Sequence, residues 1–269
     1  METGVAIERV TRFSEPMGWT EDSDNIVTEE PMEIRLLHNG KAESIAVTMR
    51  TPVNDEELAI GFLFSEGFIK KFDDITSVRI IENGNVVEVS LSCDTKNTYH
   101  TGRNFYMSSS CGVCGKSNIN EIFLKGVGVV HGSARISSRM LLSLPEKMRR
   151  KQKLFGYTGG IHAASLFDVS GRHLVTMEDI GRHNAVDKCI GYMLSNRLIG
   201  KMNTVLQISG RGGFEILQKA AMAGIPIVSS VSAPSSLAID VAETFGITLV
   251  CFVRNDRFNV YANPQRILA

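Results

Sequence analysis

Hydrophobic and polar positions alternate with a period of two along much of the first half of the chain, which is typical of β-strands. Turn-forming residues rich in asparagine and glycine separate the alternating segments in pairs, as they do in hairpins. The pattern therefore predicts two β-hairpins. Their strands cover residues 32–37 with 44–49 and residues 78–81 with 86–91.

One helix is predicted between the two hairpins. Glu56 and Glu57 complement the positive end of a helix, and a mainly apolar run over residues 58–64 follows and ends at Gly67. Residues 1–30, in contrast, are polar and acidic, and we expect them to form an irregular lead-in to the folded part.

The second half has a different rhythm, in which strand-like and helix-like segments follow one another. Pro145 is predicted at the first position of a basic helix, and residues 163–167 and 174–177 are predicted to form a hairpin. The alternation beyond them predicts a mostly parallel sheet with helices on both faces. The elements are helices over about 183–196, 214–223 and 235–245 and strands over 204–208, 227–230 and 248–253.

The change of rhythm divides the chain into an α+β unit over residues 1–136 and an α/β unit over residues 137–269. Lys+Arg and Asp+Glu both number 29, so no global field attracts nucleic acid or an anionic membrane. No apolar run approaches the roughly 20 residues that span a bilayer, and five cysteines do not make a disulfide framework. We expect a cytoplasmic protein that binds neither nucleic acid nor membrane.

Two cysteines, Cys111 and Cys114, lie three positions apart in a segment rich in serine and glycine. A thiolate is both a nucleophile and a metal ligand, and Lys116 can lower the pKa of a thiol by favouring the thiolate. A structural zinc site needs two such pairs, and a redox pair should open a helix directly after a strand. The pair therefore favours sulfur transfer through a persulfide, and no metal is expected.

Other polar segments predict a site for an anionic ligand. Two glycines precede His162, and Glu178, Asp179 and Arg182 lie beside a helix start, where free amides favour an anion. Three further junctions with Ser, Gly or Arg side chains follow predicted strands, and ligands gather at the carboxyl ends of strands in open α/β sheets. A phosphate-bearing, nucleotide-like ligand is therefore expected. The candidate residues are His162, Arg182, Ser209, Arg211, Ser232, Phe252, Val253, Arg254, Asn255, Asp256 and Arg257.

These motifs together resemble the formate dehydrogenase accessory sulfurtransferases, the FdhD family, over nearly the whole chain from about residue 30. The ordered blocks are T-M-R-T-P and D-E-E-L-A-x-G-F-L within 48–63, S-S-C-G-V-C-G-K at 109–116, T-G-G-I-H-A-A at 158–164, E-D-I-G-R-H-N-A-V-D-K at 178–188, S-G-R-G-G-F-E at 209–215, A-G-I-P at 223–226, S-A-P-S-S-L-A at 232–238 and F-V-R-N-D-R-F-N-V-Y at 252–261.

The resemblance implies a cytoplasmic homodimer with a cytidine-deaminase-like α/β/α core and a smaller β-rich N-terminal subdomain that carries the cysteine pair. It implies that persulfide sulfur passes from a cysteine desulfurase to the bis-molybdopterin guanine dinucleotide molybdenum (or tungsten) cofactor of apo-formate dehydrogenase. Cys111 would carry the persulfide and Cys114 would assist, while residues 252–257 would contact the cofactor with its guanine nucleotide. Gly213 stands where the family usually has serine.

Two other functions stay open. The chain could bind the cofactor as a non-catalytic chaperone, with incidental cysteines. A zinc-dependent nucleotide deaminase would place a glutamate two residues after a zinc-binding histidine. Ala164 stands at that position after His162, which argues against deamination.

Overall fold

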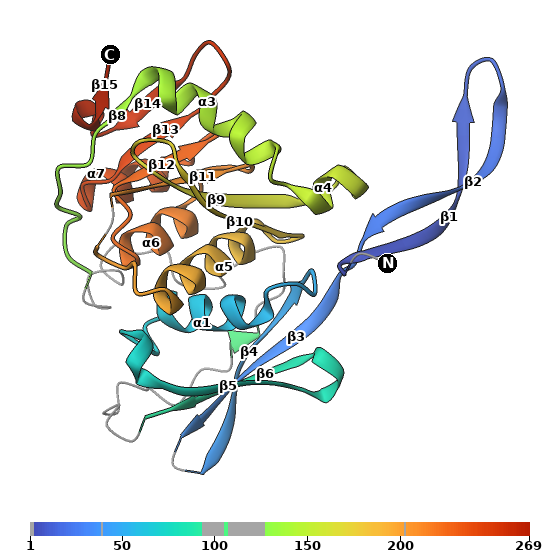
Figure 1. Cartoon of the computed structure of the whole chain (residues 1–269), viewed down its shortest axis with the longest axis horizontal. Helices are drawn as coiled ribbons and strands as arrows, with labels where there is room; N and C mark the ends of the chain where they lie inside the picture. The colour runs from blue at the N-terminus through green and yellow to red at the C-terminus, as the bar shows by residue number, and fades with distance from the viewer. Residues whose placement is uncertain (1–2, 39, 93–104, 107–126, 202) are drawn as a thin grey trace.

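The computed structural model describes residues 3–38, 40–92, 105–106, 127–201 and 203–269. Cys111, Cys114 and the predicted polar loop over residues 93–104 lie outside the described residues. Two large sheets and the helices that cover them make up the body of the protein, and a long hairpin projects from it (Figure 1).

The predicted hairpins of the first half are confirmed, and they join into one five-stranded sheet. Its strands are β3 (Glu30–His38), β4 (Lys41–Arg50), β5 (Ile75–Ile81), β6 (Val86–Leu91) and β7 (Phe105–Tyr106), in the order β5-β6-β3-β4-β7. β3 and β4 pair antiparallel, as do β5 and β6, and the two hairpins meet where β3 and β6 run parallel. The predicted helix is α1 (Asp55–Ser65), and every residue from Leu58 to Ser65 is buried.

The prediction of an irregular lead-in is wrong. Residues 5–27 form an antiparallel hairpin of β1 (Val5–Ser14) and β2 (Gly18–Val27), the arm that projects in Figure 1. At its tip Phe13 pairs with Trp19, with ring centroids 5.2 Å apart. Most side chains of the hairpin are exposed on both faces, so its sequence does not need the apolar alternation by which half-buried strands are recognised.

The second half forms a six-stranded sheet in the order β10-β9-β11-β12-β13-β14. Only β11, β12 and β13 run parallel, so the prediction of a mostly parallel sheet is wrong. Short connections lead from β9 to β10 and from β13 to β14, and such connections join antiparallel neighbours. The strands are β9 (His162–Asp168), β10 (His173–Asp179), β11 (Thr204–Ile208), β12 (Ile227–Ser230), β13 (Thr248–Cys251) and β14 (Asn259–Ala262).

Helices cover both faces of this sheet, as predicted. On one face lie α5 (Arg182–Ser195), α6 (Phe214–Met222) and α7 (Ser236–Thr244), and on the other lies α3 (Ser138–Arg149). Successive residues of β11 show the division, because Leu206 is buried in the cluster with α5 and α6 whereas Val205 is buried with Leu141 and Leu144 of α3. The sheet is therefore a central layer with apolar residues on both faces.

Pro145 does not begin a helix. It lies inside α3, which starts seven residues earlier behind Ser137, whose hydroxyl accepts a hydrogen bond from the amide of Met140 at 3.2 Å. A serine N-cap is a strong helix start. The earlier serine, and not the proline preference for the first turn, sets the beginning of this helix.

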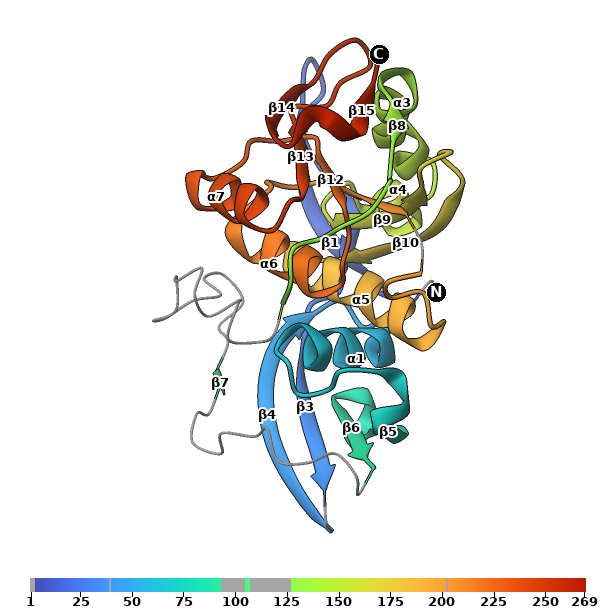
Figure 2. The ribbon, with the colours of Figure 1, turned by 90° about the vertical axis from the view of Figure 1, so that its left-hand side faces the viewer.

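Residues 127–137 run along the unit built by the six-stranded sheet (Figure 2). The amide of Val130 donates to the carbonyl of Phe245 at 2.8 Å, and the strand β8 (Ile136–Ser137) pairs in parallel with β15 (Ile267–Leu268). In the described part of the chain, no helix has the length and apolar character needed to cross a membrane. The short remaining elements are α4 (Lys153–Thr158), η1 (Phe72–Asp74), η2 (Glu82–Gly84) and η3 (Pro264–Arg266).

Helix α1 lies between the two sheets and packs on α5 (Figures 1 and 2). Two glycines allow the close approach. A Cβ on Gly61 would lie 1.8 Å from the carbonyl oxygen of Asp187, and a Cβ on Gly191 would lie 1.9 Å from that of Glu57. The backbones of the two helices are therefore in direct contact at Gly61 and Gly191, and there is no room for a side chain at either position.

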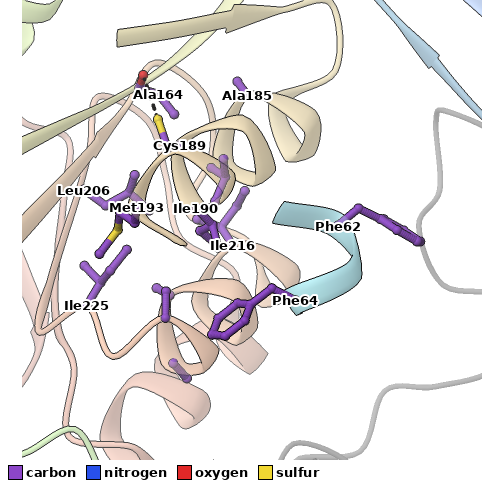
Figure 3. Packing of buried hydrophobic residues seen from close by; sticks show 14 of the residues in the cluster. Phe62, Phe64, Ala164, Ala185, Cys189, Ile190, Met193, Leu206, Ile216 and Ile225 are labelled. Atoms are coloured by element: carbon purple, nitrogen blue, oxygen red, sulfur yellow. Dashed lines mark hydrogen bonds between the residues drawn. The ribbon is translucent and has the colours of Figure 1, made fainter. Parts of the chain in front are cut away.

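On its other side, α5 packs on the six-stranded sheet. The thiol of Cys189 donates to the carbonyl oxygen of Ala164 in β9 at 3.3 Å, and Ile190 and Met193 lie toward Leu206 (Figure 3). All of these residues belong to one apolar cluster that runs from the N-terminal sheet through α1 and α5 into the six-stranded sheet. The two units thus share a single core.

We predict that Gly191→Ala destabilises the protein by about 3 kcal/mol or more, because overpacking a rigid contact commonly costs about 1–3 kcal/mol and here the new atom meets backbone. Chemical denaturation measures the change. Gly156→Ala is the matched control, since its Cβ would meet nothing within 4 Å on exposed helix α4. Equal stability of the two variants would contradict the α1–α5 contact.

Candidate functional site

The residues predicted to bind a ligand gather at one edge of the six-stranded sheet. β11, β12 and β13 end at this edge because they run parallel, and antiparallel β9 begins there. Pairing of His162 with Asp179 places the end of β10 at the same edge. We call this edge the carboxyl edge.

The loops at the carboxyl edge bind one another through the backbone. The amide of Gly212 donates to the carbonyl of Ala233 at 3.0 Å, and the amide of Phe252 donates to the carbonyl of Ser232 at 3.2 Å. The hydroxyl of Ser230 adds a bond to the carbonyl of Gly210 at 2.6 Å. The three predicted junctions therefore lie side by side at this edge.

Two helices begin at this edge without a capping side chain. Gly181 and Gly213 are the N-caps of α5 and α6, and neither helix has a side-chain capping bond. Within the described residues, the first amides of the two helices have no hydrogen-bond acceptor. Free amides at a helix start bind anions. The free amides are those of Arg182, His183 and Asn184 in α5 and of Phe214, Glu215 and Ile216 in α6.

His162 and Arg182 lie together beside these amides. A Cβ on Gly210 would lie 3.4 Å from Nδ1 of His162 and 3.5 Å from Cδ of Arg182. Both side chains therefore lie in contact range of Gly210. Burial lowers the pKa of His162, and the positive charges of Arg182 and His183 lower it further, while Asp179 opposes them. The imidazole is neutral near pH 7, and an added anion would favour its protonation.

His183 and Glu215 form a hydrogen-bonded pair that the sequence prediction did not place in the site. Nε2 of His183 lies 2.8 Å from Oε2 of Glu215, and both side chains are about a fifth exposed. Burial opposes ionisation of Glu215, but the hydrogen bond from His183 and the charges of Lys219 and Arg182 outweigh it and lower the pKa. The motifs contain both residues, but only the fold shows that they meet.

The acidic residues before α5 serve the fold, not a ligand. Both oxygens of Glu178 accept amides at the start of α4, those of Leu154 and Phe155. Asp179 and Lys188 are fully buried and their charged atoms lie 2.7 Å apart. Of the polar segment 178–188, the structure brings Arg182 and His183 to the ligand-facing edge.

Asp179 also connects the edge to the N-terminal sheet. Its carboxylate accepts the amide of Thr51 at 3.2 Å and the side-chain amide of Asn184 at 2.9 Å, and Asn184 donates at 2.8 Å to the carbonyl of Met49. The start of α5, with its free amides, is thereby held against the end of β4.

The serine and arginine candidates differ in what they can offer. Ser209 lies beside His162, because its hydroxyl oxygen accepts the amide of Ala163 at 2.9 Å and keeps its own proton to donate. Arg211 is exposed and Ser232 is half-buried, and both lie in the joined loops.

The segment after β13 forms the far end of the carboxyl edge. Phe252 is 38% exposed at a φ of 54°, a strained conformation for a residue with a side chain. Val253 is 1% exposed, so its side chain belongs to the core and is not free for a ligand. Arg254 donates to the carbonyl of Val231, while Asn255, Asp256 and Arg257 form an exposed turn.

A model of the FdhD/NarQ family matches residues 27–268. The chain belongs to this family. Relatives include the sulfur carrier protein FdhD of Picrophilus torridus, which is 52% identical over 91% of this chain and 93% of the relative. The sulfur carrier protein FdhD of Thermoplasma acidophilum is 48% identical over 98% of this chain and 94% of the relative.

A solved structure agrees with the fold. A protein of Desulfotalea psychrophila, assigned as a formate dehydrogenase accessory protein, superposes with a TM-score of 0.77 at 28% identity and covers 98% of this chain and 99% of its own. The resemblance seen in the sequence is thus confirmed, and the fold is a mixed α/β structure with several sheets. The family match begins at residue 27, so the arm lies outside it apart from the last residue of β2.

We predict that Arg182→Gln raises the pKa of His162 toward its ordinary value of 6.5, because one of the charges that lowers it is removed. NMR titration of the imidazole measures it, and Arg172→Gln, which removes an exposed arginine paired with Asp168, is the control. Between the lowered pKa and 6.5 the unfolded chain binds more protons, so His162 makes stability rise with pH in that window. An unchanged pKa in Arg182→Gln would contradict the arrangement.

Proposed function

We propose that this protein is a sulfur carrier that accepts persulfide sulfur and passes it to a molybdenum cofactor destined for formate dehydrogenase. Family membership and the relatives named as sulfur carriers support the first part. The observation that carries the second part is the carboxyl edge, where free amides of two helices meet basic side chains.

In the proposed reaction the thiolate of Cys111 attacks the outer sulfur of a persulfide on a cysteine desulfurase. A new sulfur–sulfur bond forms on Cys111, the bond within the donor persulfide breaks, and the donor cysteine leaves as a thiolate. Cys114 then attacks Cys111, which releases hydrosulfide to the cargo and leaves a disulfide. A thiol reductant must reduce this disulfide before the next cycle.

The proposed cargo is the bis-molybdopterin guanine dinucleotide cofactor, which is a substrate of the transfer. Its phosphates suit the free amides of α5 and α6 together with Arg182 and Arg211, since amides and guanidinium groups bind phosphate oxygens. The exposed ring of Phe252 offers a face on which a guanine base can stack. In this proposal the six-stranded unit is the cytidine-deaminase-like core that the resemblance implies.

We further propose that the protein works as a cytoplasmic homodimer. The arm supports this assembly, because an isolated two-stranded hairpin is marginally stable in water and exposes Ile7, Phe13, Met17 and Trp19 by more than half. A second copy would bury these side chains. The proposed protein partners are the cysteine desulfurase that donates sulfur and the apo-formate dehydrogenase that receives the cofactor.

We predict that a cysteine desulfurase with labelled cysteine adds sulfur to the wild-type protein and that Cys111→Ala abolishes the addition. Intact-mass analysis detects the extra sulfur atom. Cys114→Ala should keep the load longer, because the second thiol that displaces it is absent. Cys189→Ala is the control, since burial raises the pKa of Cys189 and keeps it an inert thiol.

Absence of label on the wild-type protein would contradict the transfer. A variant without Cys111 and Cys114 that still matures active formate dehydrogenase in cells would instead support the alternative function of a non-catalytic cofactor chaperone.

We predict that Arg182→Ala and Arg211→Ala each weaken GDP binding about tenfold, because a hydrogen bond to a charged group contributes roughly 1.5–3 kcal/mol. Calorimetric titration measures the affinity, and exposed Arg172→Ala serves as the control. GDP affinity in Cys111→Ala should equal that of the wild type. Unchanged binding in both arginine variants would place the nucleotide elsewhere.

A further inference from the structure

A cavity lies at the edge of the six-stranded sheet opposite the carboxyl edge. It encloses about 690 Å³, a size typical of small-molecule sites. The ends of α1, α5 and α6 and the segment 127–133 surround it. Figure 2 shows this segment passing beside α6 on its way to β8. We call this space the amino-edge cavity.

The amino-edge cavity is separate from the candidate cofactor site. α6 begins at the carboxyl edge with Phe214 and ends at the cavity with Met222. α5 likewise begins with Arg182 and leads at its other end to Ile199 and Gly200 of the cavity. A helix of this length spans about 14 Å at roughly 1.5 Å per residue, so one small ligand cannot occupy both places.

The walls of the cavity combine apolar side chains with polar groups, and two lysine ammonium groups are among the polar ones. Lys70, His131 and Lys201 are exposed at the cavity, and no aspartate or glutamate is among its described lining residues. Neither ammonium group forms an ion pair with a described residue. The apolar lining includes Phe64, Ile69, Val127, Ile199, Met222 and Pro226.

One wall of the cavity is held in place by Arg266. Its guanidinium donates to the carbonyl of Val130 at 3.0 Å and to that of Gly246 at 2.7 Å, and the side chain is 5% exposed. The amide of Val130 also donates to the carbonyl of Phe245, so hydrogen bonds on both sides of Val130 hold the segment 127–133 in place. The cavity is therefore preformed.

The carboxyl end of a helix attracts cations, which could by itself account for the two lysines. Here, however, the last carbonyls of the helices already accept hydrogen bonds from the backbone. The last carbonyls of α6 accept the amides of Gly224 at 3.0 Å and Ile225 at 2.9 Å, and α1 ends with the bond from Phe68 to Leu63 at 2.8 Å. The amides of Gly128, His131 and Gly132 have no acceptor among the described residues. These amides and the two ammonium groups are therefore available as donors to an anion.

We propose that the amino-edge cavity binds a small organic anion with an apolar body, such as an aromatic or branched carboxylate or sulfonate. The apolar side chains of the lining receive the body, and Lys70, Lys201 and the free amides of the segment 127–133 hold the charged group. This site is distinct from the proposed cofactor site, and it does not depend on sulfur transfer.

The test titrates naphthalene-2-sulfonate into the full chain by calorimetry, with neutral 2-naphthol as the uncharged comparison. We expect saturable binding of the sulfonate at one site per chain and at least tenfold weaker binding of 2-naphthol. Lys70→Glu with Lys201→Glu should weaken the sulfonate at least tenfold. Lys41→Glu, an exposed lysine at the start of β4, should leave it unchanged.

Met222→Trp provides a second variant, because the larger side chain fills the cavity and should exclude both probes. GDP affinity is measured on every variant and should stay at the wild-type value, since its proposed site lies at the other edge. Absence of saturable sulfonate binding, equal affinity for 2-naphthol, or full affinity in the double lysine variant would each overturn the proposal.

Discussion

The contact between α1 and α5 is the constraint on which the architecture depends. Gly61 and Gly191 let each helix approach the backbone carbonyls of the other, so the distance between the helices is set by backbone and not by side chains. α1 carries the N-terminal sheet on one side, and α5 carries the six-stranded sheet on the other. A change in this contact would move the start of α5, where Arg182 meets the glycine loop.

Two buried charge pairs hold α5 to its other neighbours, β10 and α6. Lys188 binds Asp179 and also the carbonyl of Thr51, while Lys219 of α6 binds Asp187 of α5 at 2.7 Å. Burial opposes the charge of Lys219, but Asp187 and Glu66 outweigh it and raise its pKa. Buried pairs contribute little net stability, yet loss of one partner leaves an unpaired charge, so such pairs favour one arrangement over its alternatives.

The polarity of the helices gives the two edges of the sheet different chemistry. α5 and α6 direct their amino ends toward His162 and the joined loops, and an anion is favoured there without a large net charge on the protein. The phosphate-bearing cargo that we propose would therefore need no net positive charge on the chain, in which acidic and basic residues are equal in number. At the other edge the helix ends are capped, and lysine side chains supply the positive charge.

Local pattern was sufficient for the two predicted hairpins over residues 32–49 and 78–91 and for the strands and helices between residues 183 and 253, because burial on one or both faces imposes periodicity on their sequences. It was also sufficient to place Ser209, Ser232 and Phe252 at strand ends. The amino-acid sequence and its motifs identified the family as well.

Only the tertiary structure decided the remainder, because it depends on contacts between distant residues. The arm was missed because few of its side chains are buried. The strand directions were missed because β14 was not recognised and because the pairing of β11 with β9 is not local. The pairing of His183 with Glu215 and the burial of Asp179 against Lys188 likewise arise only when α5, α6 and β10 meet. Residue type predicts the chemistry of a group, but packing determines whether that group faces a ligand or the core.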